Sequence, residues 1–182
     1  MTGYLYTVKM ALSPCLASQD PLMQTNNFSG KLSFQFLSEP TDVNFGGKVH
    51  GGAVMKWIDQ TAFACAGSWC ESYCVTVYVG GIRFYKPIKI GEMVRVDAAI
   101  IYTGNSSMHI AIDVFSKNIV EKDFQKTTHC IIVFVAVDAA GNKMPVPRWQ
   151  PVSEQEKMHE QYALRLIELR KKIEEEMAPF YS

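Results

Sequence analysis

The sequence has no excess of charge of either sign, because 18 lysines and arginines balance 18 aspartates and glutamates. Without net charge, no general electrostatic field draws the chain to nucleic acid or to an anionic membrane surface, so no nucleic-acid partner is expected. Long apolar runs are also missing. The longest, Cys130–Val137, is far shorter than the roughly 20 residues that a membrane helix needs. We therefore expect no membrane span.

A disulfide framework is missing as well. The five cysteines are an odd number and contain no Cys-x-x-Cys pair, which favours free thiols in a reducing compartment. We expect a cytoplasmic location. Residues 1–30 have no basic segment ahead of an unbroken apolar stretch, because Lys9 interrupts it, and we interpret them as an N-terminal extension.

Several well-known catalytic motifs are also absent. The chain has no Gly-x-Ser-x-Gly elbow, which argues against a serine hydrolase of the α/β type. It has no His-Glu-x-x-His or similar spacing, so no metal is expected. Its glycines at 46, 47, 51 and 52 match neither a phosphate-binding loop nor the dinucleotide fingerprint. Nucleotide hydrolysis and hydride transfer are therefore not supported.

What is present is the pattern of one α+β domain over residues 31–150. Apolar and polar side chains alternate from residue 31, which is the period of a half-buried strand. A glycine-rich passage then leads into an apolar, proline-free segment at 53–68, long enough for about four helical turns. Segments of strand character follow at 74–84, 93–102, 108–115 and 127–138. This order predicts one antiparallel sheet packed on one helix.

A second helix is predicted over the C-terminal segment, residues 151–182. Three prolines at 145, 147 and 151 mark the end of the preceding unit. Ser153 then offers a helix N-cap, with Glu156 three residues on, which is the pattern of a capping box. Apolar residues recur after it at helical spacing, so the helix should be amphipathic and pack on the sheet or on another subunit.

The segment from Asn44 to Asp59 combines the residue types that acyl-transfer chemistry needs. Glycines just before a helix allow a ligand to approach backbone N–H groups that are unpaired and lie at the positive end of the helix dipole. Such groups can hold a carbonyl oxygen as it becomes an oxyanion. Asp59 is the only carboxylate on the apolar helix and could act as a general base or a nucleophile.

A structural interpretation of the same residues stays open at this point. Lys56 and Asp59 are three positions apart and could form a surface ion pair, and the glycines could simply shape a turn. Pattern alone gives the two interpretations about even weight.

The string Asn44-x-x-Gly47-x-x-His50-Gly51-Gly52, followed by Asp59, resembles the signature of hotdog-fold acyl-CoA thioesterases. The stretches that carry the wider resemblance, to the ACOT-type branch, are LSEPTDVNFGGKVHGGAVMKWIDQTA, VTVYVGGIRFYKPIKIGEMV and FVAVDAAGNKMPVP. They cover about residues 32–150 in the family's order. The resemblance implies a sheet of five or six antiparallel strands wrapped around the helix of 53–68.

The resemblance also implies roles for single residues. Gly51 would polarise the thioester carbonyl with its N–H, Asp59 from the partner subunit would activate water or attack directly, and Asn44 would orient the water or the thioester. His50 and Gly52 would shape the substrate site. Lys48 departs from relatives with Asn or Asp at this position, which questions the need for a second carboxylate there.

Groups that contact coenzyme A are expected at the mouth of the site. By their place in relatives, the resemblance suggests Arg83, Arg148 and the turn Asn105, Ser106 and Ser107. The other interpretation is that these are solvated side chains and ordinary turn residues.

The sequence therefore predicts an acyl-CoA thioesterase that yields free fatty acid and CoA, with no cofactor apart from the CoA within its substrate. The resemblance implies a homodimer as the minimal active unit and allows a trimer of dimers. Two alternatives remain: a hotdog protein that binds acyl-CoA without cleaving it, and a hotdog enoyl-thioester hydratase. The hydratase is the poorer match, because His50 and Asp59 are not arranged as its Asp–His pair.

Overall fold

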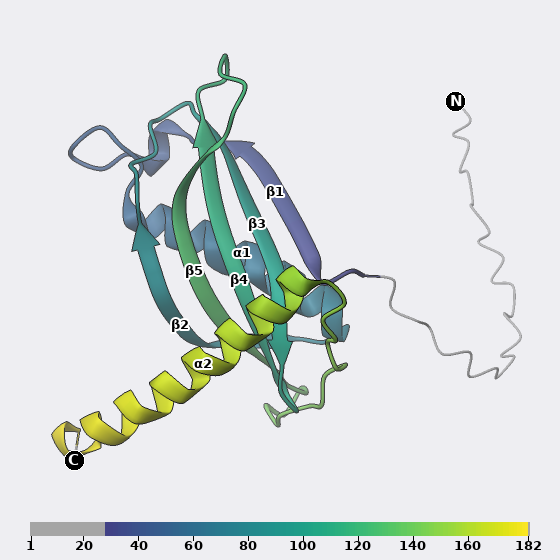
Figure 1. Cartoon of the computed structure of the whole chain (residues 1–182). Helices are drawn as coiled ribbons and strands as arrows, with labels where there is room; N and C mark the ends of the chain where they lie inside the picture. The colour runs from purple at the N-terminus through teal and green to yellow at the C-terminus, as the bar shows by residue number, and fades with distance from the viewer. Residues whose placement is uncertain (1–27, 182) are drawn as a thin grey trace, which may run out of the picture.

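The computed structural model describes residues 28–181, so most of the predicted extension, residues 1–27, lies outside the described residues. Its elements follow the predicted order (Figure 1). They are β1 (Lys31–Leu37), a 3-10 turn (Pro40–Asp42), α1 (Gly51–Cys70), β2 (Cys74–Phe84), β3 (Met93–Thr103), β4 (Ser107–Lys117), β5 (Gln125–Ala136), α2 (Glu154–Met177) and a 3-10 turn (Ala178–Phe180).

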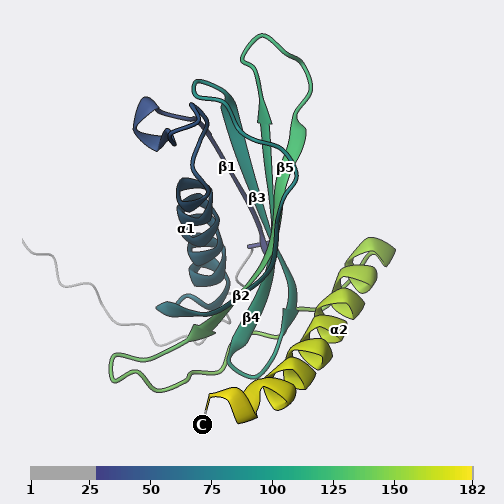
Figure 2. The same cartoon turned by 90° about the vertical axis from the view of Figure 1, so that its left-hand side faces the viewer.

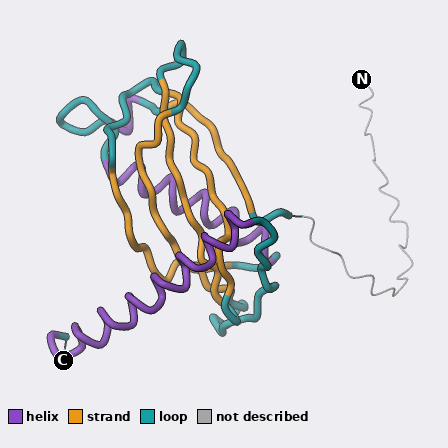
Figure 3. Tube along the Cα trace, in the orientation of Figure 1, coloured by secondary structure: helices purple, strands orange, loops and turns teal. Residues whose placement is uncertain are grey.

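The strands form one antiparallel five-stranded sheet in the order β1-β3-β4-β5-β2, which confirms the predicted α+β hotdog layout. β5 is an interior strand, as its long apolar run predicts. The two long helices lie on opposite sides of the sheet (Figure 2), and the tube view shows α2 crossing the strands obliquely (Figure 3). No helix among residues 28–181 is long and apolar enough to cross a membrane.

The core lies between α1 and the sheet. Side chains at every second position of β3 and β4, including Val96 and Ile112, are fully buried and point toward α1. α1 contributes a row that includes Val54, Ile58 and Ala62, spaced by four residues, so that it lies on one face of the helix.

The other face of α1 is not covered by any other part of residues 28–181. Its apolar character predicts a helix surrounded by other elements, but Met55 is 46% exposed and Phe63 is 41% exposed. The two lie on either side of Asp59 at spacings of four, and all three are exposed. The sheet can contact only one side of a helix, so the described residues leave this apolar row exposed.

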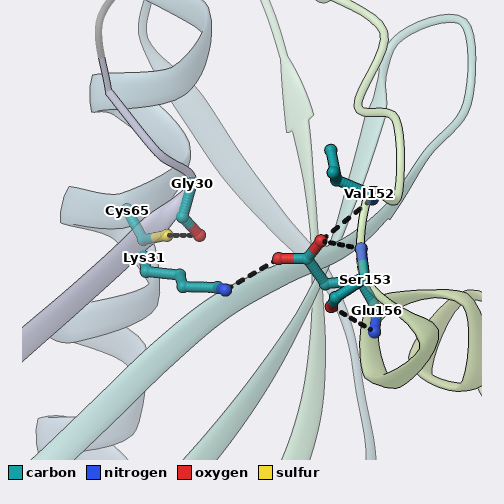
Figure 4. A network of polar contacts seen from close by, with 6 residues as sticks. All are labelled: Gly30, Lys31, Cys65, Val152, Ser153 and Glu156. Atoms are coloured by element: carbon teal, nitrogen blue, oxygen red, sulfur yellow. Dashed lines mark hydrogen bonds and ion pairs between the residues drawn. The ribbon is translucent and has the colours of Figure 1, made fainter.

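The predicted capping box forms at the start of α2, and its glutamate also contacts the sheet. The Ser153 hydroxyl accepts a hydrogen bond from the Glu156 N–H at 3.2 Å, and the Glu156 carboxylate accepts one from the Ser153 N–H at 3.1 Å. The other carboxylate oxygen accepts from Lys31 Nζ of β1 at 2.7 Å (Figure 4). These contacts lower the pKa of Glu156 to about 2, with Lys31 as the largest cause. The start of α2 is thereby fixed to the edge strand β1.

Further along, α2 covers a buried histidine on the outer face of the sheet. His109 is 6% exposed and lies edge-on to Tyr102, with ring centroids 5.3 Å apart. Burial, and to a smaller extent the nearby charge of Arg170, lowers the pKa of His109 to about 4. The imidazole is therefore neutral in the folded protein at neutral pH.

This histidine predicts a loss of stability in mild acid. Between its unfolded pKa of about 6.5 and its folded value, the unfolded chain binds a proton that the folded chain excludes, so the free energy of unfolding falls as the pH falls. Between pH 7 and pH 5, the free energy of unfolding of wild type should fall by about 2 kcal/mol more than that of His109→Gln. Urea unfolding at a series of pH values and one fixed protein concentration measures how the free energy of unfolding of each protein depends on pH. Parallel curves for the two proteins would contradict this prediction.

Candidate active site

The glycines at 51 and 52 form the N-terminus of α1, directly after an extended His50. The His50 Nδ1 accepts a hydrogen bond from the Ala53 N–H at 3.0 Å and so caps the helix. A Cβ atom at residue 52 would lie 3.0 Å from the imidazole ring, so a glycine there leaves room for the cap. His50 is a structural cap in this chain.

The N–H groups of Gly51 and Gly52 remain available. Neither has an acceptor within residues 28–181, because the first amides of a helix have no carbonyl one turn earlier. They are exposed and lie at the positive end of the dipole of a 20-residue helix. This is the geometry of a site for a carbonyl oxygen that gains negative charge.

Asn44 organises the loop that leads to this helix end. Its Oδ1 accepts hydrogen bonds from the N–H groups of Gly46 at 2.8 Å and Lys48 at 3.1 Å, and Gly47 completes the turn with a φ of 72°. The His50 N–H donates to the Asp42 carbonyl at 2.9 Å, which holds the loop beside the start of α1. The side-chain NH₂ group of Asn44 has no partner among residues 28–181, so it is available to a ligand.

Asp59 contacts a residue that the sequence reasoning missed. The Thr76 hydroxyl on β2 donates to Asp59 Oδ1 at 2.7 Å, whereas no ion pair between Lys56 and Asp59 forms in the described part of the chain. The hydroxyl orients the carboxylate and leaves Oδ2 open. Thr76 could have been suspected only as a polar side chain within the apolar first half of its strand, because its partner is 17 residues away along the chain.

Two cavities lie along the line between α1 and β2. One, of about 310 Å³, is lined by Gly51, Phe84 and Pro87, among others. The other, of about 290 Å³, contains Asp59 and is otherwise mostly apolar, with Met55, Ile58, Val79, Ile82 and Ile132 in its wall. A larger cavity of about 480 Å³ lies under α2 on the outer face of the sheet and contains neither Gly51 nor Asp59.

Within one chain, Gly51 and Asp59 are separated. Eight residues of α-helix correspond to about 12 Å along the axis, and both residues lie on the same rigid helix. One thioester carbonyl therefore cannot contact the Gly51 N–H and the Asp59 carboxylate of the same chain. This separation constrains any mechanism that uses both groups.

The suggested CoA-contacting residues fall into two groups in the described chain. Arg83 is near the N-terminus of α1, because the next residue, Phe84, lines the same cavity as Gly51. The turn Asn105–Ser107 lies at the other end of the sheet, where the Val146 N–H donates to the Asn105 carbonyl at 2.9 Å. Arg148 is exposed in the segment that runs along this turn. A single chain does not bring the two groups together.

Comparison with known proteins agrees with this fold. Residues 46–122 match the model of a family described as the Thioesterase superfamily. An uncharacterized acyl-CoA thioester hydrolase of Buchnera aphidicola is 36% identical over 62% of this chain and 85% of its own length. An apo-hexameric acyl-CoA thioesterase is 30% identical with a TM-score of 0.75, over 79% of this chain and 92% of that one.

An acyl-CoA hydrolase from Staphylococcus aureus, solved with butyryl coenzyme A, coenzyme A and coenzyme A disulfide, is 27% identical with a TM-score of 0.75. The match covers 84% of this chain and 94% of that one. The chain belongs to the thioesterase superfamily. Its resemblance to hotdog acyl-CoA thioesterases is thereby confirmed.

The cap predicts how His50 variants behave. His50→Ala should lower the free energy of unfolding by about 1 kcal/mol, because it leaves the Ala53 N–H without its side-chain acceptor. His50→Asn is the matched control, since asparagine is a good N-cap residue, and it should retain near wild-type stability. Chemical unfolding of the three proteins gives the comparison. An equal loss for both variants would show that the imidazole acts by another contact.

Proposed function

We propose that this protein hydrolyses acyl-CoA thioesters to a free fatty acid and coenzyme A. The observation that carries the proposal is the Asp59 carboxylate, which the Thr76 hydroxyl orients at 2.7 Å beside an apolar cavity. Relatives named as acyl-CoA thioester hydrolases support this reaction class over acyl-CoA binding alone and over a hydratase. The apolar wall suits an acyl chain.

In the proposed reaction the thioester carbonyl oxygen accepts a hydrogen bond from the Gly51 N–H. The carbonyl carbon becomes more electrophilic, and the N–H and the helix dipole stabilise the negative charge of the tetrahedral intermediate. Asp59 takes a proton from a water molecule as its oxygen attacks that carbon. The carbon–sulfur bond then breaks, and the CoA sulfur leaves with a proton returned by Asp59. The Asn44 side chain orients the water or the thioester.

Spacing in a solved relative supports these roles. Variants of the Staphylococcus aureus hydrolase have been solved in which an asparagine, an aspartate or a threonine is replaced by alanine. The asparagine and aspartate of that enzyme are 15 positions apart, and the aspartate and threonine are 17 apart. The same separations join Asn44 to Asp59 and Asp59 to Thr76.

The active unit we propose is a homodimer in which Gly51 and Asp59 of one site come from different chains. Gly51, Met55, Asp59 and Phe63 follow one another at intervals of four, so they form one row along α1. If two α1 helices pack antiparallel about a two-fold axis at Met55, residue 51 of one chain lies opposite residue 59 of the other. That arrangement covers the exposed row and removes the separation of about 12 Å within one chain.

The edge strand β2 offers a second contact for the same dimer. It is an 11-residue strand at the end of the sheet, with one side unpaired. Val77 is 53% exposed and Val79 is 43% exposed. A long, apolar, unpaired edge is a site for strand pairing with another chain. Solved thioesterase relatives are hexameric, and we propose a trimer of dimers as the larger assembly.

The remaining proposals concern CoA contacts and location. We propose that Arg83, Arg148, Asn105, Ser106 and Ser107 contact the CoA portion, with the two groups contributed by different chains of the assembly. His50 and Gly52 shape the same mouth. A cytoplasmic location is supported by the four described cysteines, all of which are free.

Replacing the proposed base tests the reaction directly. Asp59→Ala should lower kcat by about 10²- to 10⁴-fold, because water then has no positioned proton acceptor. Release of free CoA thiol, followed colorimetrically with short, medium and long acyl-CoAs, measures both the activity and the chain-length preference.

Circular dichroism and sizing serve as controls, since fold and dimer should be unchanged in this variant. Near-normal hydrolysis by a pure sample of Asp59→Ala would exclude the proposed role. Tight binding of acyl-CoA by wild type with no thiol release would instead favour a protein that only binds acyl-CoA.

Subunit mixing tests whether the site is shared. Gly51→Pro removes the proposed N–H donor, yet proline suits the first position of a helix, and the extended His50 before it is compatible with proline. Gly51→Pro and Asp59→Ala should each be inactive alone. After random exchange of chains, heterodimers hold one intact site, and about a quarter of wild-type activity should return.

Gly51→Ala is the matched control for this experiment, because it keeps the N–H and its Cβ would meet Phe84 at an ordinary contact distance of 3.6 Å. It should stay active. Failure of the mixture to recover, with heterodimers verified by mass, would place both groups in the same chain.

A further inference from the structure

Cys70 and Cys74 face each other across the turn that joins α1 to β2. Cys70 is the last residue of α1 and Cys74 is the first residue of β2, and their Sγ atoms are 3.2 Å apart. Neither residue has a part in the proposed hydrolysis. Both are free thiols, Cys70 half-buried and Cys74 2% exposed.

The backbone of the turn brings the two sulfurs together. Glu71 adopts a left-handed conformation with a φ of 51°, and its N–H donates to the Gly67 carbonyl at 2.8 Å, which ends the helix and reverses the chain. The Ser72 carbonyl oxygen lies 3.7 Å from the Cys70 Sγ and 3.5 Å from the Cys74 Sγ. The sulfurs need to approach by only about 1 Å to reach bonding distance.

Cys70 differs from the other described cysteines in the direction of its pKa shift. The contact with Cys74 lowers the pKa of Cys70 to about 7, whereas the same contact and burial raise the pKa of Cys74. Burial raises the pKa of Cys65 to about 12 and that of Cys130 to about 11. At neutral pH the thiolate, which is the reactive form, is therefore concentrated at Cys70.

We propose that Cys70 and Cys74 form a redox-active dithiol site that hydrogen peroxide closes to a disulfide. The Cys70 thiolate attacks one peroxide oxygen, the O–O bond breaks, and the other oxygen leaves as hydroxide, which takes up from solvent the proton that the Cys70 thiol had released and becomes water; Cys70 is then a sulfenic acid. Cys74 then loses its proton and attacks the Cys70 sulfur, and the sulfenic oxygen leaves as a second water. Two thiols are oxidised by two electrons in total, and one peroxide is reduced.

The position of the pair suggests a regulatory effect. A disulfide across so short a loop removes little chain entropy from the unfolded state, so it contributes less to stability than one closing a long loop. The disulfide does tie the last residue of α1 to the first residue of β2. Helix α1 carries Asp59, and β2 carries Thr76, two residues after Cys74. This consequence rests on the proposed function. We expect disulfide formation to lower kcat, and dithiothreitol to restore it.

The position of Glu71 between the cysteines gives a direct test. The reduced full-length protein is treated with hydrogen peroxide, free thiols are alkylated, and the chain is cut by a glutamate-specific protease. Because the Glu39–Pro40 bond resists this protease, cleavage after Glu71 and Glu92 separates residues 1–71 from residues 72–92 unless a disulfide joins them. We expect the joined fragment in the oxidised sample, the loss of two thiols per chain, and separation of the fragments by dithiothreitol.

Three variants decide which sulfur reacts. Fragment 1–71 also contains Cys15 and Cys65, so Cys15→Ala and Cys65→Ala are the controls, and each should still give the joined fragment. Cys70→Ser should abolish it. A joined fragment that persists in Cys70→Ser, or oxidation of wild type without any joined fragment, would overturn the site.

The disulfide readout does not depend on catalysis, so it separates this inference from the proposed function. A joined fragment with no hydrolysis in the reduced enzyme would reject the function alone. Hydrolysis without a joined fragment would reject the dithiol site alone. An unchanged kcat in fully joined protein would reject the regulatory effect.

Discussion

Burial of one face of α1 against the antiparallel sheet is the constraint on which the rest of this structure depends. Val54, Ile58 and Ala62 pack on the inner side chains of the sheet, which sets the rotation of the helix about its axis. Once that rotation is set, the row with Met55, Asp59 and Phe63 must face away from the sheet core. The same packing holds the helix N-terminus, with its unpaired amides, at the end of β2 near Phe84.

The helix α1, which packs on the sheet to form the core, thus also carries both groups that we propose for catalysis, Gly51 and Asp59. Its rigidity separates Gly51 from Asp59 by a distance that no side-chain rotation can span. The separation within one chain and the exposed apolar row beside Asp59 are two consequences of one geometry. In the homodimer that we propose, a two-fold axis reverses the direction of the second α1 helix and so brings Gly51 of one chain near Asp59 of the other.

The two ends of α1 play different parts. At its start, the imidazole of His50 satisfies one amide and leaves two amides open, so the capping residue selects which N–H groups can meet a ligand. At its end, the left-handed Glu71 turns the chain sharply enough to place Cys74 against Cys70 and to begin β2. The hydrogen bond from Thr76 to Asp59 forms because this turn reverses the chain, so that β2 runs beside α1.

Much of the fold could be predicted from the sequence, since alternation and helical spacing are local properties. The segment 74–84 was placed at its observed bounds, and the capping box of Ser153 and Glu156 formed as its spacing indicates. The local pattern also selected Asp59, as the single carboxylate on an apolar helix, and the glycines before that helix, whereas the roles of Asn44 and Gly51 came from the family resemblance.

The partners of these residues depended on tertiary structure. Lys56 was the expected neighbour of Asp59 by helical spacing, but the strand brings Thr76 closer and its hydroxyl takes the contact. The exposure of one face of α1 could not be predicted either, because an apolar helix has the same sequence pattern whether its own sheet or another chain covers it. By itself the sequence determined which segments are helix and strand and which residues carry reactive or hydrogen-bonding groups. Only the tertiary structure decided which of them meet, because contacts between distant segments arise from packing that no local pattern records.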